Sequence, residues 1–164
     1  MRAVCILSSF IAIILCSCWF MDDLVIQADK KTFDKERAAW DNQNLKNYQF
    51  TYKYSDGATG PGSPVKVTVK ENEEPVIENQ RENYGYFFKS ISEIYNHVNG
   101  TFDYVESVKN GTYDGHKIRS VTLDITYNKQ YHYPTKVDLS TGYVEQIAGG
   151  AYYNLEITEF VPIQ

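Results

Sequence analysis

The sequence predicts an α+β domain: an antiparallel β-sheet with two main helices packed on one face, in the order α-β-β-β-α-β-β-β. Two segments, 29–46 and 91–108, repeat apolar residues at three- and four-residue steps, as amphipathic helices do. The segments that follow each of them alternate apolar and polar residues, a pattern typical of half-buried strands. Stretches rich in Gly, Pro and Asn separate these alternating segments and indicate turns.

The first 18 residues are typical of an export signal. Arg2 precedes an apolar stretch, residues 4–15, that is shorter than the roughly 20 residues needed to span a bilayer. The segment Leu15-Cys16-Ser17-Cys18 resembles the lipobox of bacterial lipoproteins, in which the signal is cut before a Cys that becomes acylated. We therefore predict a lipoprotein signal peptide over residues 1–17, a lipid such as palmitate on Cys18, and a tether over residues 18–28.

Two alternatives to this interpretation stay open. Cleavage before Cys16 would place the bulky Leu15 where a small side chain is expected. An ordinary signal peptide, or an apolar start that stays attached, would leave the cysteines incidental. In each case residues 29–164 form a single exported domain, and we predict a cell-envelope location on the periplasmic or outer surface of a bacterial membrane.

The positions of the cysteines and the net charge argue against several classes of site and partner. All 3 cysteines lie in the first 18 residues, so the predicted domain holds no disulfide and no thiolate metal site. Lys and Arg number 16 against 21 Asp and Glu, a net charge of -5. Nucleic-acid binding normally relies on a basic surface, so we expect no nucleic-acid partner. The expected partners are the membrane, through the lipid, and an envelope protein, peptide or glycan.

The first half of the domain is predicted to be one helix and three strands. Phe33 and Trp40 lie at helical spacing within residues 29–46, with Trp40 as a core anchor against the sheet. Tyr48, Phe50 and Tyr52 then alternate with polar residues, which predicts a strand. Two further strands are expected over residues 65–69 and around residues 76–77, after a Gly/Pro-rich connection and a short turn.

The second half is predicted to be one helix followed by three or four strands. Ser90 and Glu93 form the sequence pattern of a capping box, so a helix is expected to begin after Ser90. Gly100 falls inside that helix and would allow a kink, and Asn110-Gly111 is expected to end it. The strands that follow are predicted over residues 118–127, 135–139, 143–147 and 152–161.

The sequence contains no recognisable catalytic motif. Asp114 with His116, and His132 with Asp138, are pairs of metal-ligating residue types, but neither has a third ligand nearby in sequence. We interpret these histidines as solvated loop residues and predict no metal site, no cofactor and no catalytic residue. A binding or scaffolding module is therefore favoured over an enzyme. The alternative is a hydrolase with an unrecognised carboxylate or histidine site.

The segment from Tyr127 to Thr135 carries a resemblance to a known family. Its pattern Tyr-x-x-x-Tyr-x-Tyr-Pro-Thr, with Trp40 before Asn47-Tyr48, is similar to small bacterial lipoproteins that carry one domain of unknown function. The resemblance spans residues 36–161 and implies a fold and a location, not an activity. The chain departs from the family at Asn128 and His132, where relatives often have Asp and Gly, and it lacks the paired cysteines of some relatives.

Residues Tyr131, His132, Tyr133 and Pro134 are the predicted binding surface. Three ring side chains and a Pro fall in one turn between two strands. Pro134 restricts the residue before it to an extended conformation, so the turn would lose little entropy on binding. Tyrosines also offer apolar area with a polar tip. The alternative is that Pro134 starts an edge strand and the tyrosines cap the core.

Overall fold

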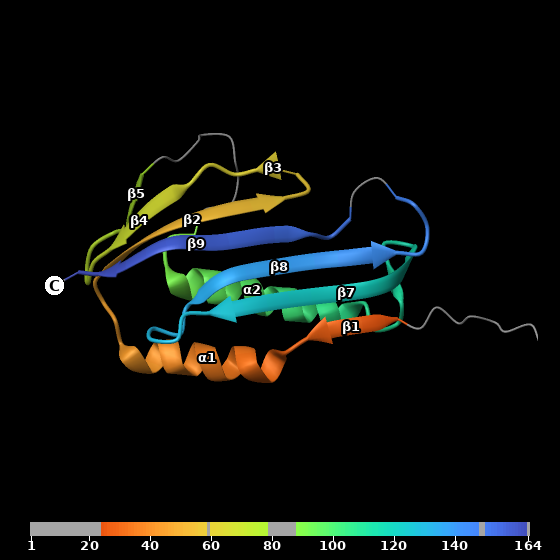
Figure 1. Cartoon of the computed structure of the whole chain (residues 1–164), viewed down its shortest axis with the longest axis horizontal. Helices are drawn as coiled ribbons and strands as arrows, with labels where there is room; N and C mark the ends of the chain where they lie inside the picture. Colours follow the sequence, from red (N-terminus) through yellow and green to blue (C-terminus); the bar gives the residue numbers. More distant parts are fainter. Residues whose placement is uncertain (1–23, 59, 79–87, 148–149, 164) are drawn as a thin grey trace, which may run out of the picture.

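The structure is a computed structural model that describes residues 24–58, 60–78, 88–147 and 150–163. The predicted signal peptide, Cys18 and most of the predicted tether lie outside these ranges. The described chain forms a nine-stranded sheet and two helices, so the predicted mixture of strands and helices is confirmed (Figure 1). None of the helices in the described ranges combines the length and the apolar character needed to cross a membrane.

The described chain contains strands that were not predicted, namely β1 (Val25–Ala28), β3 (Gly60–Pro61) and β6 (Thr112–Tyr113). In chain order, the elements are β1, α1 (Lys30–Gln43), β2 (Tyr48–Asp56), β3, β4 (Val65–Val69), β5 (Val76–Glu78), α2 (Ile91–Ser107), β6, β7 (His116–Tyr127), β8 (Pro134–Tyr143) and β9 (Tyr153–Pro162). The main path through the sheet is β1-β7-β8-β9-β2-β4-β5, with β3 beside β2 and β6 beside β7. The second half of the chain therefore joins the first through the pairing of β9 with β2.

The first strand corrects two expectations. Residues 25–28 were assigned to the tether, but they form β1 and pair with β7 in parallel, Val25 opposite Ser120. The sheet is thus antiparallel in its other pairs and parallel at this edge. The chain between β1 and β7 includes both helices, and it provides the long connection that a parallel pair requires.

Two further differences concern the strands of the second half. β8 runs without a break to Tyr143, so residues 143–147 do not form the separate strand that was predicted. The long strand β7 begins at His116, two residues before the predicted start, and its first residues form a short hairpin with β6. Residues 79–87, between β5 and α2, lie outside the described ranges.

Both helix starts are capped by side chains. The Asp29 carboxylate accepts a hydrogen bond from the Thr32 backbone N–H at 2.9 Å and begins α1. The Ser90 hydroxyl accepts from the Glu93 N–H at 3.1 Å, as predicted, while the Glu93 carboxylate accepts from the N–H of Lys89 at 2.6 Å. α2 continues through Gly100 to Ser107, so the glycine does not end it.

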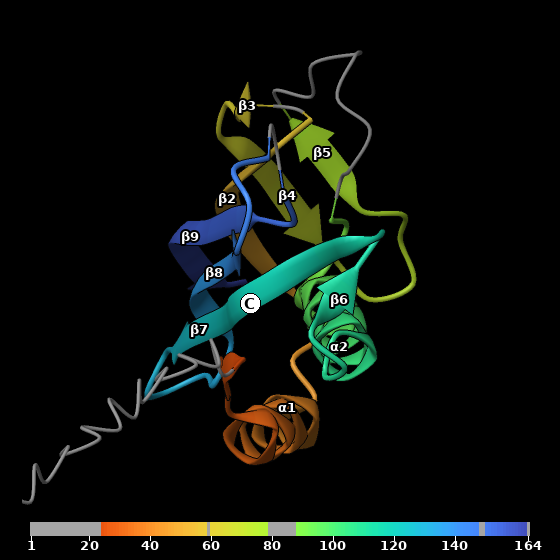
Figure 2. The same cartoon turned by 90° about the vertical axis from the view of Figure 1, so that its right-hand side faces the viewer.

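The two helices meet the same face of the sheet. Trp40 of α1 packs edge-on against Tyr48 of β2, with ring centroids 5.5 Å apart. The Tyr48 hydroxyl in turn accepts a hydrogen bond from the Ile91 N–H at the start of α2. The helices also contact each other, because the ring centroids of Phe33 in α1 and Phe102 in α2 are 5.0 Å apart. Figure 2 shows α1 and α2 side by side beneath the curved sheet. The core fills this space, and the opposite sheet face is open to solvent.

Candidate binding site

The turn that the sequence singled out lies between β7 and β8 and is built around Asn128. The Asn128 side-chain oxygen accepts hydrogen bonds from the backbone N–H groups of Gln130 and Tyr131, at 2.9 and 2.8 Å. Its own N–H donates to the Tyr133 carbonyl at 2.9 Å. His132 adopts a left-handed φ of 61°. Asn128 thus organises the turn, and the backbone N–H of His132 closes it by donating to the Asn128 carbonyl at 2.9 Å.

Much of this turn is used for packing. Tyr133 and Pro134 are buried, and the Tyr133 ring stacks on Phe160. Helix α1 covers the rest: Glu36 lies 2.7 Å from the His132 Nδ1, and the Gln43 side-chain amide donates to the Tyr131 carbonyl. This arrangement corresponds to the packing alternative for Tyr133. Pro134 does start a strand, but β8 pairs with both β7 and β9 and is therefore not the edge strand of that alternative. Tyr131 and His132 stay partly exposed at the surface.

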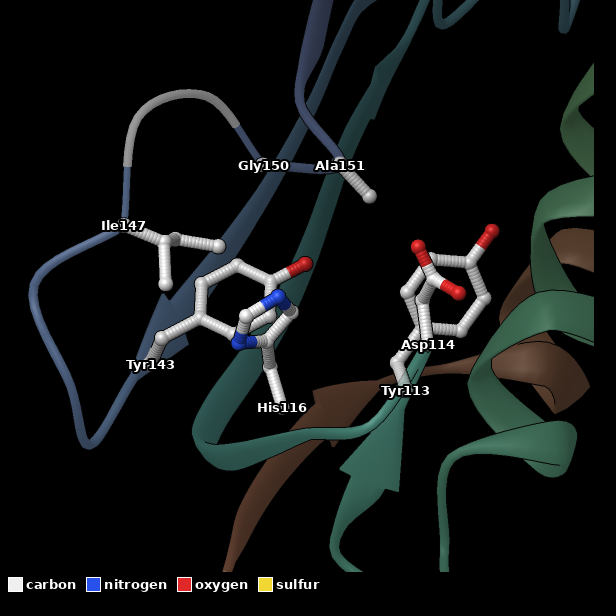
Figure 3. A pocket seen from close by; sticks show the side chains of 7 residues that line it. All are labelled: Tyr113, Asp114, His116, Tyr143, Ile147, Gly150 and Ala151. Carbon is white, nitrogen blue, oxygen red and sulfur yellow. The ribbon is translucent and has the colours of Figure 1, made fainter.

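A hollow of about 570 Å³ lies at the opposite end of the β7–β8 hairpin. We call it the end pocket. Its volume falls in the usual range of small-molecule sites. It opens between the β6–β7 turn, the end of β8 and the segment that precedes β9 (Figure 3). Its lining residues are Tyr113, Asp114, His116, Tyr143, Ile147, Gly150 and Ala151.

The β6–β7 turn positions three of these side chains. Asp114 and Gly115 both have positive φ, 48° and 78°, as in the two-residue turns that match the twist of a hairpin. Tyr113 and His116 are therefore paired directly across the turn. Sequence reasoning noted Asp114 and His116 as a ligand pair but missed the hairpin. The Asp-Gly dipeptide between two short alternating runs was the signal that could have found it.

Aromatic contacts hold the two walls of the end pocket. Tyr104 of α2 packs edge-on against Tyr113, with centroids 5.0 Å apart. The Tyr104 hydroxyl is itself hydrogen-bonded to the Thr141 hydroxyl at 2.9 Å. On the other wall the His116 and Tyr143 rings are perpendicular, with centroids 6.3 Å apart. Figure 3 shows Tyr113 and Asp114 on one side of the hollow and His116 with Tyr143 on the other.

Gly150 closes the pocket against Tyr143. Its φ is 153°, and a Cβ added there would lie 2.9 Å from Cε2 of Tyr143. Real Cβ contacts of that length essentially do not occur, so any larger residue would push the Tyr143 ring. Glycine at this position is therefore needed for the ring to keep its place.

The charged groups around the end pocket are mainly acidic. The Asp114 carboxylate lines it, and Oε2 of Glu145 lies 3.9 Å from Nδ1 of His116. Asp114 and His116 therefore do come together at one hollow. His132 and Asp138 do not share partners: His132 contacts Glu36, while Asp138 contacts Lys136 and Asn154. In the described ranges, no group of three or more His, Cys, Asp or Glu residues is placed to hold a metal ion.

A second, shallower hollow of about 330 Å³ lies along α2 beside His97. Tyr153, Phe88 and Tyr54 surround the His97 ring, with centroids 4.9, 5.2 and 5.7 Å away. Burial lowers the pKa of this imidazole, against the opposing charge of Asp56. His97 thus behaves as an uncharged part of the aromatic packing.

One comparison with known proteins gives a match. Residues 32–160 match a protein family described as a family of unknown function, DUF6174. Neither the curated proteins nor the solved structures include one that matches the chain.

Proposed function

The chain belongs to the DUF6174 family of unknown function, and we propose that it is an exported, lipid-anchored envelope protein that binds a ligand in the end pocket. The observation that carries this proposal is the position of the pocket relative to the predicted anchor. The pocket and the start of β1 lie at the same end of the sheet.

The pairing of β1 with β7 supports this geometry. The two strands are parallel, and Val25 is opposite Ser120, four residues after His116. Both strands therefore start at the end of the sheet where the pocket opens (Figure 1). Cys18 precedes Val25 by seven residues in the sequence, and seven residues span at most about 25 Å. A lipid on Cys18 would hold the pocket close to the membrane surface.

The build of the pocket supports a binding role. Its walls combine aromatic and aliphatic side chains with polar groups, and ligand sites use such polar groups to orient what they bind. The wall residues come from β6, β7, β8 and the segment before β9, so the site depends on the folded domain as a whole. Ring contacts from α2 hold Tyr113 in place before any ligand arrives.

The anchor is tested by metabolic labelling with a fatty-acid analogue in a bacterial host. We expect the wild-type chain and Cys16→Ala to be labelled, and Cys18→Ala to be unlabelled and released from the membrane fraction. Cys16→Ala is the matched control, because it removes a thiol two residues away. Labelling of Cys18→Ala, or loss of labelling in Cys16→Ala alone, would contradict the proposed anchor.

A further inference from the structure

We propose that the end pocket binds an ammonium group, carried either by a small soluble amine or by a phospholipid headgroup. Cations bind over the faces of aromatic rings within about 6 Å of the ring centre, and recognition of quaternary ammonium by aromatic residues is a common use of this interaction. The end pocket combines three rings with the Asp114 carboxylate, and a second carboxylate, that of Glu145, lies 3.9 Å from the lining residue His116.

The rings are placed to surround a ligand rather than to fill the space themselves. Tyr113 stands on one wall, and Tyr143 and His116 stand on the other, with their rings at 89° to each other (Figure 3). Tyr113 is 43% exposed although its ring is in T-shaped contact with Tyr104. A ring that a neighbour holds in place while it stays exposed can contact a cation without first having to move.

The local charge favours a cation. Asp114 provides a carboxylate at the wall, and Glu145 adds a second one behind His116. Among the described lining residues there is no Lys or Arg. Lys117 follows His116, but successive side chains of a strand point to opposite sides, so it is directed away from the His116 side. An anionic ligand would meet these carboxylates, while an ammonium group would be attracted by them.

The source of the ammonium group depends on the proposed anchor. If Cys18 is lipidated, phospholipid headgroups lie within reach of the pocket. Exposed apolar side chains at this end of the sheet also suit a lipid interface: Val25 is 59% exposed and Tyr152, which follows the lining residue Ala151, is 49% exposed. The ammonium chemistry itself rests on the pocket residues and does not require the lipid.

The first experiment titrates the purified full chain, in a neutral detergent, with choline and with its neutral isostere, in which carbon replaces the nitrogen. Binding is followed by the aromatic NMR signals of Tyr113 and Tyr143. We expect choline to shift both signals in a saturable way and to bind at least tenfold more tightly than the isostere. Equal binding of the two compounds, or no saturable shift with choline, would overturn the proposal.

Substitutions of the lining residues test whether choline binds in the end pocket. Asp114→Asn and Tyr143→Leu should each weaken choline binding about tenfold. Asp138→Asn is the matched control, because it removes a carboxylate from β8 outside the pocket, and it should leave the affinity unchanged. Tyr113→Leu serves as a second ring variant, since its exposed side chain can be replaced with little effect on folding. Choline affinity that is unchanged in all three pocket variants would overturn the assignment.

A second experiment identifies the source. The lipidated chain is reconstituted in phosphatidylglycerol vesicles or in phosphatidylcholine vesicles, and choline is titrated into both. Weaker apparent binding of free choline in phosphatidylcholine supports a headgroup as the ligand, because the headgroups compete. Equal binding supports a soluble amine. If Cys18 carries no lipid, the reconstitution fails while the detergent titration still reports on the pocket, so the two proposals fail separately.

Discussion

The rings of Tyr133 and Phe160 stack with their centroids 4.4 Å apart and their planes at 27°. Tyr133 ends the turn between β7 and β8, whereas Phe160 lies near the end of β9. Trp40 of α1 also contacts Phe160 in a T-shaped arrangement, with the ring centroids 5.9 Å apart. One aromatic cluster therefore joins the turn, the last strand and the first helix, and it explains why the turn holds its conformation.

Replacing Tyr133 should be costly, because it empties space in this cluster. Tyr133 is 7% exposed, so Tyr133→Ala is expected to lower the free energy of unfolding by about 3–5 kcal/mol. Tyr131→Ala should cost less, since Tyr131 is only partly buried. Urea unfolding of the two variants measures the difference. Small and equal losses would show that the turn is not packed as described, and would restore all four residues 131–134 as a binding surface.

The side chain of Asn128 should matter as a hydrogen-bond acceptor rather than for its size. Asn128→Ala leaves two backbone N–H groups of the turn without their partner and should cost about 1–3 kcal/mol. Asn128→Asp keeps an acceptor oxygen at the same place and should retain most of the stability. Thermal unfolding of both variants checks this. An aspartate variant as unstable as the alanine variant would contradict the role given to the oxygen.

His97 should make the domain less stable in mild acid. Its pKa in the folded state is lowered from 6.5 by burial, so the unfolded chain binds the proton more readily. The stability that depends on the neutral imidazole is therefore fully present above pH 6.5 and is lost as the pH falls below that value. The midpoint temperature of the wild type should drop between pH 7.5 and pH 5.5, which are roughly one unit either side of 6.5.

The contribution of His97 to this drop is isolated by substitution. His97→Phe keeps a ring beside Tyr153 and Phe88 but cannot take up a proton. Its midpoint temperature should change less over the same pH interval than that of the wild type. An identical pH dependence in both chains would mean that another group causes the acid sensitivity.

The elements of the fold were largely predictable because their signals are local. Alternating residues such as Tyr48, Phe50 and Tyr52 have only one way to bury their rings on a single face, and β2 forms where they predict it. The strand over Val65–Val69 has the predicted bounds. The helix after Ser90 begins as predicted, because the Ser90 hydroxyl accepts a hydrogen bond from the backbone N–H of Glu93, only three residues away.

The candidate site was only partly predictable. Asp114 and His116 stood out as residue types, but their partners Tyr143 and Gly150 reach the end pocket from other parts of the chain. The turn at residues 128–133 was recognised by its composition, whereas the helix that covers it is almost a hundred residues away in sequence, as the contact between Glu36 and His132 shows. A local sequence pattern predicts which side chains a segment presents on one face. It does not predict which distant segments pack against them.

The sequence by itself determined the apolar faces and the cap at Ser90, because these depend on neighbours a few residues apart. Tertiary structure decided that residues 25–28 join the sheet in parallel with β7, since a four-residue strand has no pairing signal of its own. It also decided that Tyr133 is core while Tyr113, an equally aromatic residue beside a turn, is open at a pocket. The difference arises from long-range packing: Phe160 stacks on Tyr133 and is itself packed against Trp40, whereas Tyr113 contacts Tyr104 and stays 43% exposed.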